Sequence, residues 1–318
     1  MAVYTHVGGD DLTRLLADYD LGAVTGYEGV AQGVENTNYI LTTARGRFIL
    51  TLFEKRVAEA DLPFFMAAME HLAKGGAPVP MPVPDRKGKI FNRVCGRPAT
   101  IFSFLHGRQH MTPSAADCRE MGVMTARLHR AAAGFALRRP NTLSLGGWKL
   151  IAEKCAADAG RCAPGLGAIV ADELTRLEEI WPLALPDGLV HADLFPDNVF
   201  FNDGAISGVI DFYFACTDFY AYDLALTLNA WSADDGVWGA ERASALVAGY
   251  QHVRRLTHAE CAAMPTLLAG AALRILLTRL HDWLHRIDGA VVTVKDPLPY
   301  RDLLLFHRRG GSASLFGA

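Results

Sequence analysis

Short β-type patterns and two helical patterns fill the first hundred residues. Leu12 and Leu16 recur at helical spacing in DDLTRLLADYD, and residues 60–73 form a second helical stretch that ends at GGAPVPMPVP. Between the two helices, TGYEGVAQGVENTNYILTTARGRFILTLFEK reads as strands separated by glycine and asparagine turns. Two more strands are predicted around residues 89–94 and 99–104. The pattern predicts an antiparallel sheet with helices.

From Thr112 onward, long segments rich in Ala, Leu and Arg predict helices. The predicted helices cover approximately residues 113–132, 147–157 and 166–180, with others after Tyr220, after Val237 and from Thr257 to His285. The only strand-like stretch expected there is GLVHADLFPDNVFFNDGAISGVIDF, with two short runs around its NDG turn. We therefore predict an α+β fold with an N-terminal β-rich lobe over residues 1–105, a helical C-terminal lobe over 106–318, and a ligand between them.

Composition agrees with two soluble domains. The chain has 318 residues, of which 51% are hydrophobic and 20% charged. Its formal net charge is −3, and Lys and Arg are scattered rather than gathered in a stripe. Nucleic acid is therefore not an expected partner.

The cysteines and the apolar segments indicate a cytoplasmic protein. Six cysteines show no CxxC or zinc spacing, and the N-terminus lacks the pattern of a signal peptide. The most apolar stretch, MPTLLAGAALRILLTRLHDWL, is interrupted by Arg274, Arg279 and Asp282. We expect a buried core helix there and no membrane partner.

A cluster of polar residues predicts phosphoryl-transfer chemistry. His191, Asp193, Asn198 and Asp211 fall within 21 residues, on a proline-containing loop and after a hydrophobic strand. Transfer from ATP needs a carboxylate that orients and deprotonates the attacking hydroxyl, and oxygen ligands for Mg²⁺. We assign Asp193 as the catalytic base and Asn198 and Asp211 as metal ligands. His191 is expected to hold the loop by hydrogen bonding.

These residues also carry a family resemblance. HxDxxxxN followed by a hydrophobic-Asp-Phe step resembles the signature of the protein-kinase-like superfamily, and HADLFPDN resembles its aminoglycoside phosphotransferase and choline kinase branch. Six collinear segments are similar to bacterial homoserine kinases: GVENTNYIL, FILTLFEKR, LPFFMAAMEHLAKGGAPVP, HADLFPDNVFF, GVIDFYFACTDFYAYDLALTLNAW and LRILLTRLHDWL. The resemblance implies a two-lobed kinase-like fold and ATP-dependent phosphorylation of L-homoserine to O-phosphohomoserine, for threonine biosynthesis.

The resemblance also implies where the nucleotide binds. A loop between two strands would fold over the phosphates, and a hinge strand would meet adenine through its backbone. The residues concerned are Gly33, Asn36, Thr37 and Asn38 in the loop, and Phe102 and Phe104 in the hinge. An NTN turn on its own is more often a simple hairpin.

The sequence departs from the wider family at the phosphate cation. Thr51 takes the place of the usual third-strand lysine, and Phe65 that of its glutamate partner, with Glu70 off register. Loss of both members is self-consistent, because a glutamate without its cation is costly to bury. Lys55, Arg56 or backbone amides of the GVENTN loop are the alternatives for the phosphate contact.

Homoserine carries a carboxylate and an ammonium group, so its pocket needs an arginine and an acceptor. Arg274 and Arg279 are the candidate arginines, with ion pairs to Asp282 or Asp223 as the alternative. Asp223 and Trp231 are candidate substrate contacts, although the first suits a helix N-terminus and the second a core.

Several further alternatives stay open. Tyr222 is a second aromatic candidate for the pocket wall, Asp197 would be a third metal ligand or the cap of a turn, and Asp218 resembles Asp223. Other small alcohols, among them choline, methylthioribose and aminoglycosides, are alternative acceptors. A catalytically silent nucleotide-binding regulator is the alternative outside enzymes, and a metal-dependent hydrolase would need more ligands. The oligomeric state and feedback by threonine are not predicted.

Overall fold

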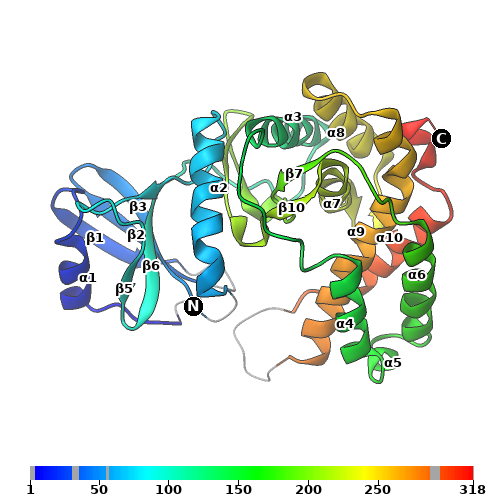
Figure 1. Cartoon of the computed structure of the whole chain (residues 1–318), viewed down its shortest axis with the longest axis horizontal. Helices are drawn as coiled ribbons and strands as arrows, with labels where there is room; N and C mark the ends of the chain where they lie inside the picture. Colours follow the sequence, from blue (N-terminus) through cyan, green and yellow to red (C-terminus); the bar gives the residue numbers. More distant parts are fainter. Residues whose placement is uncertain (1–3, 31–35, 55–56, 287–293, 318) are drawn as a thin grey trace. The chain divides into compact units, whose positions relative to one another are not determined.

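The computed structural model describes residues 4–30, 36–54, 57–286 and 294–317. The chain divides into two compact units, each containing its own helices and strands (Figure 1). The first unit comprises Met1–Gly107 with Ser207–Tyr213, and the second comprises Arg108–Ile206 with Phe214–Ala318. The division thus follows Gly107 rather than Leu105, and it groups a short segment that contains Asp211 with the first unit.

An antiparallel sheet forms the centre of the first unit. Its strand order is β1-β2-β3-β6-β4, and β5 also pairs with β6. The strands are β1 (Val24–Gly29), β2 (Thr37–Thr43), β3 (Gly46–Leu52), β4 (Pro82–Val83), β5 (Asn92–Val94) and β6 (Arg97–Ser103). The predicted antiparallel sheet is confirmed. Strand β4 was not predicted, because two residues are too few to show a period of two.

Helix α1 (Gly9–Leu16) completes the hydrophobic core on one face of this sheet. Its Leu12 and Leu15 lie in one buried cluster with alternate residues of the strands, among them Leu41 of β2 and Leu50 of β3. Alternation places Asn38 and the other intervening residues on the opposite face. Helix α2 (Leu62–Lys74) follows a single 3₁₀ turn, η1 (Glu59–Asp61), and buries one apolar side.

The second unit is mainly helical, and α9 is its central element (Figure 1). Its helices are α3 (Ala115–Ala131), α4 (Leu145–Cys155), α5 (Ala159–Cys162), α6 (Leu166–Ile180), α7 (Tyr220–Ser232), α8 (Ala240–Val253), α9 (His258–Leu284) and α10 (Leu298–Arg308), with 3₁₀ turns η2 (Pro196–Asn198), η3 (Phe212–Phe214, across the unit boundary) and η4 (Ala313–Phe316). The helices predicted after residue 112 are all present, whereas α5 and α10 were not predicted. The predicted α+β class is confirmed.

Two glycines allow α3 and α8 to approach closely. A Cβ atom added at Gly122 would lie 2.0 Å from the carbonyl oxygen of Leu246, and one added at Gly249 would lie 2.1 Å from that of Arg119. Neither distance leaves room for a side chain. The backbones of the two helices are therefore in direct contact, which places α8 where its polar residues can reach into the unit.

Helix α9 begins with a capping box between Thr257 and Glu260. In the described part of the chain, it is the one helix long and apolar enough to cross a membrane, but 67% of its most apolar window is buried inside the protein. Buried residues lie on all sides of its middle section. It therefore packs as the core helix that the sequence predicted.

The strands of the second half differ from the prediction. They are β7 (Asp187–Val190), β8 (Val199–Asn202), β9 (Ala205–Val209), β10 (Cys216–Phe219), β11 (Ala233–Asp234) and β12 (Val237–Trp238). The NDG turn between β8 and β9 is present, with positive φ at Asp203 and Gly204. However, β10 to β12 lie outside the stretch that was predicted to be the only one, and β10 pairs with β7. That prediction was wrong because these strands have two to four residues, too few to show a pattern.

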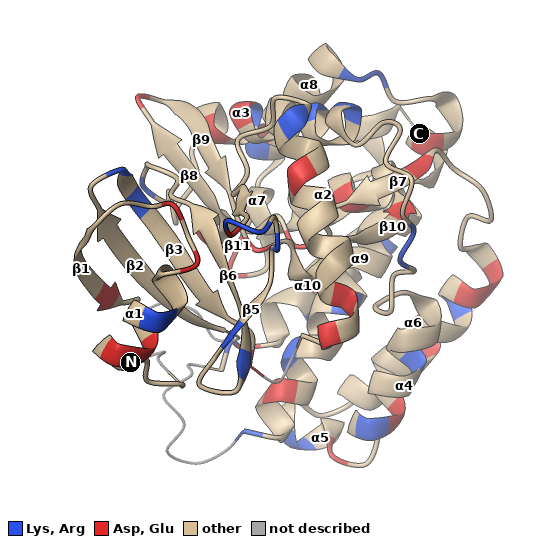
Figure 2. Ribbon diagram, turned by 60° about the vertical axis from the view of Figure 1, so that its left-hand side comes forward, with Lys and Arg blue, Asp and Glu red and all other residues tan. Residues whose placement is uncertain are grey.

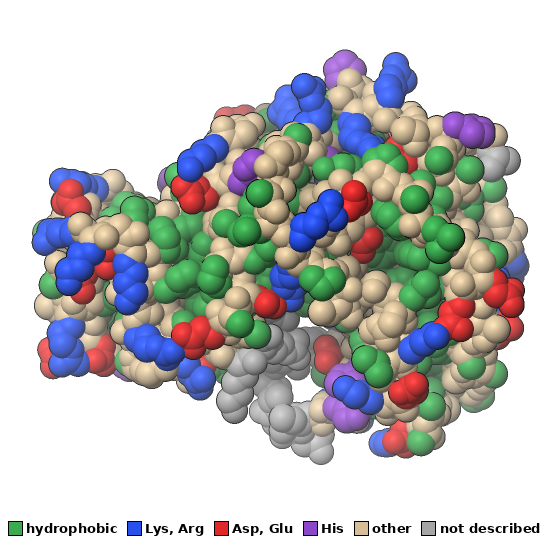
Figure 3. Space-filling model, viewed as in Figure 1, with side chains coloured by type: hydrophobic (Ala, Val, Ile, Leu, Met, Phe, Trp, Pro, Cys, Tyr) green, Lys and Arg blue, Asp and Glu red, His purple; other side chains and the backbone are tan. Residues whose placement is uncertain are grey.

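Basic and acidic residues are interspersed along the helices and strands (Figure 2). On the face shown in Figure 3, hydrophobic side chains, some of them adjoining one another, lie among polar and charged ones. All six cysteines are free thiols.

A buried histidine fastens α10 to α7. His307 lies 2.8 Å through Nε2 from the Asn229 carbonyl oxygen and 3.0 Å through Nδ1 from the Ser312 hydroxyl. Since an amide oxygen can only accept, Nε2 carries a proton. Burial lowers the pKa of His307 to about 3, so the ring is neutral near pH 7 and its Nδ1 then accepts from the Ser312 hydroxyl.

This neutral ring predicts a loss of stability in acid. In the unfolded chain His307 binds a proton below about pH 6.5, whereas in the folded chain it stays neutral down to about pH 3. The free energy of unfolding should therefore fall as the pH drops from 6.5, by up to about 1.4 kcal/mol per pH unit from this group. Denaturant unfolding of the wild type and of His307→Gln at several pH values measures it. Gln keeps a donor for Asn229 but cannot titrate, so parallel pH curves for the two proteins would contradict the prediction.

Candidate active site

The loop HADLFPDN follows β7 and ends in the 3₁₀ turn η2. Its residue Ala192 has a positive φ of 62°, a backbone conformation that costs a side-chain-bearing residue free energy. The Asp193 N–H donates to His191 Nδ1 at 3.2 Å, and the Phe195 N–H donates to the Asp193 carbonyl at 2.9 Å. His191 is buried. Its ring thus lies against the backbone of the residue predicted to be the base.

The carboxylate of Asp223 in α7 accepts hydrogen bonds from the backbone of this loop. Its Oδ1 accepts the Ala192 N–H at 2.7 Å and its Oδ2 accepts the His191 N–H at 3.3 Å. His129 of α3 donates to Oδ2 from Nε2 at 3.0 Å. Asp223 is buried, and both of its carboxylate oxygens are bonded inside the unit. It therefore supports the loop, and these bonds do not favour the predicted contact with a substrate.

The environment of Asp223 keeps it ionised. Burial by itself raises the pKa of its carboxyl, but the hydrogen bond and charge of His129 and the nearby His191 outweigh burial, so the pKa lies below its ordinary value. The network continues from His129 Nδ1 to the Tyr250 hydroxyl at 2.9 Å, which accepts from Arg254 at 3.0 Å. Arg254 in turn pairs with Glu260 at 2.8 Å.

Trp231 and Arg274 bind carbonyl groups of the same loop. Trp231 of α7 is fully buried and donates from Nε1 to the Leu194 carbonyl at 2.8 Å. Arg274 of α9 donates from Nη1 to the Ala192 carbonyl. Both side chains were predicted as substrate contacts, and both instead reach the backbone of the catalytic loop.

Asn198 is held beside Asp193. Its Nδ2 donates to the Asp193 carbonyl at 2.9 Å and to the Asp193 Oδ2 at 3.2 Å. These bonds use the amide hydrogens, so the amide carbonyl oxygen is the group that Asn198 offers to a cation. An amide oxygen beside a carboxylate is a hard oxygen donor set of the kind that Mg²⁺ prefers.

No three His, Cys, Asp or Glu side chains gather as a metal centre among the described residues. Magnesium does not require such a cluster, because it keeps several waters and takes oxygens from substrate phosphates. The second predicted ligand, Asp211, follows β9, has a positive φ of 68° and belongs to the first unit. The donor chemistry of these residues therefore fits magnesium.

Asp197 has partners of its own. Its Oδ2 pairs with Lys295 at 3.1 Å, and its carbonyl accepts from the side chain of Gln109. Lys295 lies in the segment just before α10. Asp197 therefore connects the loop to this segment, and these contacts leave the choice between metal ligand and turn cap open.

Asn36 and Thr37, two of the residues predicted to lie in the nucleotide-binding loop, form hydrogen bonds inside the first unit. Thr37 is fully buried, donates to Glu54 Oε1 at 2.8 Å and accepts from backbone N–H groups of residues 4 and 5. The Asn36 side chain accepts the Glu54 N–H at 3.4 Å. The Thr37 hydroxyl is thus bonded inside the unit, and the placement of Thr37 in a nucleotide-binding loop stays a prediction.

Thr51 lies in a row of uncharged polar side chains across the sheet. The register pairs it with Asn38 on one side and Thr100 on the other. Its hydroxyl donates to Asn38 Oδ1 at 2.7 Å. A short neutral hydrogen bond therefore stands where the wider family has a lysine.

An aromatic cluster stands where the wider family has the glutamate partner. The ring of Phe65 from α2 lies edge-on to Tyr213 with centroids 5.8 Å apart, and the ring of Phe53 lies edge-on to the same Tyr213 at 5.5 Å. Glu70 pairs with Lys74 on the surface of α2. Apolar contacts thus connect α2 to the segment that carries Asp211.

The remaining nucleotide candidates divide into three groups. Phe102 is buried in β6 and pairs with Pro82, and Phe104 follows the strand with Arg47 3.9 Å above its ring. Gly33 lies outside the described residues. Lys55 and Arg56 lie outside them as well.

Arg279 differs from Arg274 in its surroundings. It is half-buried, donates to the Asp296 carbonyl at 3.0 Å and lies 4.6 Å above the ring of Tyr300. Burial, with smaller effects from charges that include Asp193, raises the pKa of Tyr300 to about 12. Arg279 thus stacks on a buried tyrosine whose pKa is raised in small part by the charge of Asp193.

Asp218 and Tyr222 are inside the second unit. Burial raises the pKa of Asp218, whose Oδ2 accepts from Asn141 at 2.7 Å. Tyr222 is fully buried on α7, and the edge of the Trp181 ring meets its ring. Tyr222 is a core residue, as the alternative interpretation had it.

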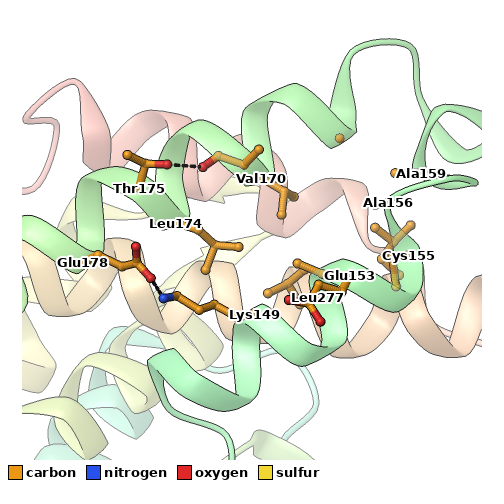
Figure 4. A pocket seen from close by; sticks show the side chains of 14 residues that line it. Lys149, Glu153, Cys155, Ala156, Ala159, Val170, Leu174, Thr175, Glu178 and Leu277 are labelled. Atoms are coloured by element: carbon orange, nitrogen blue, oxygen red, sulfur yellow. Dashed lines mark hydrogen bonds and ion pairs between the residues drawn. The ribbon is translucent and has the colours of Figure 1, made fainter.

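A pocket of about 330 Å³ opens between α4, α6 and α9 (Figure 4). Its lining is mainly apolar, with an ion pair between Lys149 and Glu178 at one side. None of the predicted site residues lines it. The pocket is therefore separate from the loop.

Sequence reasoning missed the residues that position the loop from a distance. They are Gln109, His129, Tyr250, Arg254 and Lys295, together with Tyr300. Each comes from an element far from HADLFPDN in the chain. Of these residues, only His129 could have been found from the sequence, because in ARLHRA it lies on the apolar side of a predicted helix.

Comparison with known proteins places these observations in a family. Residues 26–264 match the phosphotransferase enzyme family. Homoserine kinases from Methylobacterium sp. (strain 4-46) and Sinorhizobium medicae (strain WSM419) are 52% and 50% identical to the chain, covering 100% of it and 99% and 98% of their own lengths. The similarity thus extends over the whole length of the chain.

Solved structures agree in fold. An amicoumacin kinase in complex with AMP-PNP, Ca²⁺ and amicoumacin has a TM-score of 0.70 at 18% identity, covering 95% of this chain and 93% of its own. A spectinomycin phosphotransferase in complex with ADP and spectinomycin has a TM-score of 0.70 at 13% identity, covering 98% and 100%. The chain thus has the kinase-like phosphotransferase fold, and it belongs to the phosphotransferase enzyme family and, within it, to the homoserine kinases.

Proposed function

We propose that the protein transfers the γ-phosphoryl group of ATP to the side-chain hydroxyl of L-homoserine, giving ADP and O-phosphohomoserine for threonine biosynthesis. The observation that carries the proposal is a catalytic loop whose Asp193 is fixed by its own backbone bonds and by Asn198, in a chain about half identical to homoserine kinases over its whole length. The six free cysteines suit a reducing compartment, so we place the reaction in the cytoplasm.

Asp193 acts on the acceptor hydroxyl. Its carboxylate accepts a hydrogen bond from the hydroxyl, turns an oxygen lone pair toward the phosphorus and takes the proton as the new oxygen–phosphorus bond forms. The hydrogen bond from Asn198 Nδ2, 3.2 Å from Asp193 Oδ2, keeps the carboxylate in one orientation. Preorganisation of this kind avoids an entropy loss during the reaction.

Asn198 and Asp211 are the residues proposed to hold Mg²⁺, one as a neutral and one as an anionic oxygen ligand. Magnesium, when bound with ATP, neutralises negative charge on the phosphates. Because the strand lysine is replaced by Thr51, which bonds to Asn38, the protein's own cation for the phosphates is not on that strand.

The homoserine carboxylate is proposed to bind Arg279. Its guanidinium is half-buried, and it lies over Tyr300, whose pKa responds to Asp193. A planar guanidinium suits a carboxylate through paired hydrogen bonds.

The acceptor is tested by recording ADP release over a panel of homoserine, choline, methylthioribose and an aminoglycoside. We expect homoserine to give the highest kcat/KM, with one ADP formed for each O-phosphohomoserine. Lack of turnover with homoserine would disprove the acceptor. ADP release that depends on any of these acceptors would exclude a catalytically silent regulator.

Asp193→Asn should lower kcat by roughly 10²–10⁴-fold, because an amide cannot accept the proton. ATP affinity, measured by calorimetry, should change little, since Asp193 serves the hydroxyl rather than the nucleotide. Asp158→Asn is the matched control, because it removes the charge of an exposed carboxylate of the second unit whose side chain pairs, among the described residues, only with Arg161. Normal turnover of Asp193→Asn would refute the role of Asp193 as base.

Asp211→Asn should raise the magnesium concentration that gives half-maximal activity by at least about tenfold, since losing about 1.4 kcal/mol of binding free energy corresponds to that factor. The amide keeps the shape of the side chain but removes its charge. Activity is measured over a magnesium titration at saturating ATP. An unchanged magnesium dependence would remove Asp211 from the ligands.

A further inference from the structure

Ala192, the residue before the catalytic carboxylate, is held in a conformation that it does not prefer. Its φ of 62° lies in the left-handed region, where a Cβ atom crowds the carbonyl oxygen at a cost of about 1–2 kcal/mol. Such a conformation persists only where its surroundings over-determine it. Because Asp193 follows directly, any relaxation of Ala192 would swing the catalytic carboxylate.

Two oppositely charged side chains grip this one residue. Asp223 accepts the Ala192 N–H at 2.7 Å, and Arg274 donates from Nη1 to the Ala192 carbonyl. The first comes from α7 and the second from α9. Hydrogen bonds to charged groups are stronger than neutral ones. Both backbone groups of Ala192 are thus fixed by charge-assisted bonds from separate helices.

The surroundings of Arg274 are those of a structural residue. Its exposure is 2%, and its guanidinium lies 5.6 Å from the centre of the Phe214 ring. Its Nε is buried and has no hydrogen-bond partner among the described residues. Because Arg274 is almost completely buried, its guanidinium has little exposed surface that a substrate carboxylate could contact.

We infer that Arg274 is a positioning residue for Asp193, which acts by clamping the Ala192 carbonyl opposite the Asp223 carboxylate, and that it does not bind the homoserine carboxylate. Only the expected effect of Arg274 on kcat rests on the proposed function. The clamp itself is a property of the loop and can be measured without any substrate.

The first test is amide hydrogen exchange of residues 191–198 in the protein without ligands. Arg274→Met should raise exchange in this segment by about tenfold or more, because one of the two charged contacts to Ala192 is lost, while Arg274→Lys, which can still donate to one carbonyl, should give an intermediate value. Arg176→Met is the matched control. It removes a half-buried arginine from buried Glu173 on α6, and Glu173 keeps Arg308.

Exchange in 191–198 that is the same in Arg274→Met as in the wild type would overturn the clamp. An equal rise in Arg176→Met would do so as well, because it would show a general loss of stability. Thermal unfolding followed by circular dichroism identifies any variant that does not fold. If Arg274→Met does not fold, the test uses Arg274→Lys. Exchange in 191–198 of Arg274→Lys equal to that of the wild type would then overturn the clamp.

The second test separates positioning from substrate binding. Arg274→Met should lower kcat by about 10²-fold, the scale of a displacement of the catalytic group by about 1 Å, and leave KM for homoserine within about threefold. Arg279→Met should do the reverse and raise KM. A large rise in KM with unchanged kcat for Arg274→Met would mean that Arg274 binds the substrate. If the wild type does not phosphorylate homoserine, the proposed function fails, whereas the exchange result still decides the clamp.

Discussion

The buried carboxylate of Asp223 accepts the backbone N–H groups of His191 and Ala192, and the catalytic loop has its shape because of these two bonds. Ala192 disfavours the left-handed conformation, so contacts from outside the loop are needed to hold it there. The carboxylate supplies the opposing free energy from inside the second unit. It is itself held by His129, so α3 and α7 together determine where Asp193 points.

This constraint accounts for a buried polar network inside the second unit. His129, Tyr250, Arg254 and Glu260 form a continuous chain of hydrogen bonds that ends at the capping box of α9. Buried polar groups are tolerated when each has its partners, and such a network fixes a single arrangement of the helices. The close packing of α3 against α8, which Gly122 and Gly249 permit, brings Tyr250 to His129.

In the first unit, neutral and aromatic contacts stand at the positions of Thr51 and Phe65. The resemblance predicts a lysine and a glutamate at these two positions, where the described part of this unit has uncharged side chains. Thr51 instead shares a short hydrogen bond with Asn38, and Phe65 packs on Tyr213, two residues after Asp211. Apolar packing carries no desolvation penalty of the kind that an ion pair has. Helix α2 is therefore joined to the Asp211 segment by aromatic rings.

The sequence by itself determined the α+β class, the antiparallel sheet and the long helices, because periodicity is a local property of the chain. Its motif spacing also predicts the roles of Asp193, Asn198 and Asp211. It missed strands of two to four residues and α10, whose patterns are short. Only the tertiary structure shows that the side chains of Asp223, Trp231 and Arg274 bond to the backbone of the HADLFPDN loop. A buried charge on a helix looks the same in sequence whether it faces a substrate or a backbone carbonyl, and only the packing of distant helices chooses between them.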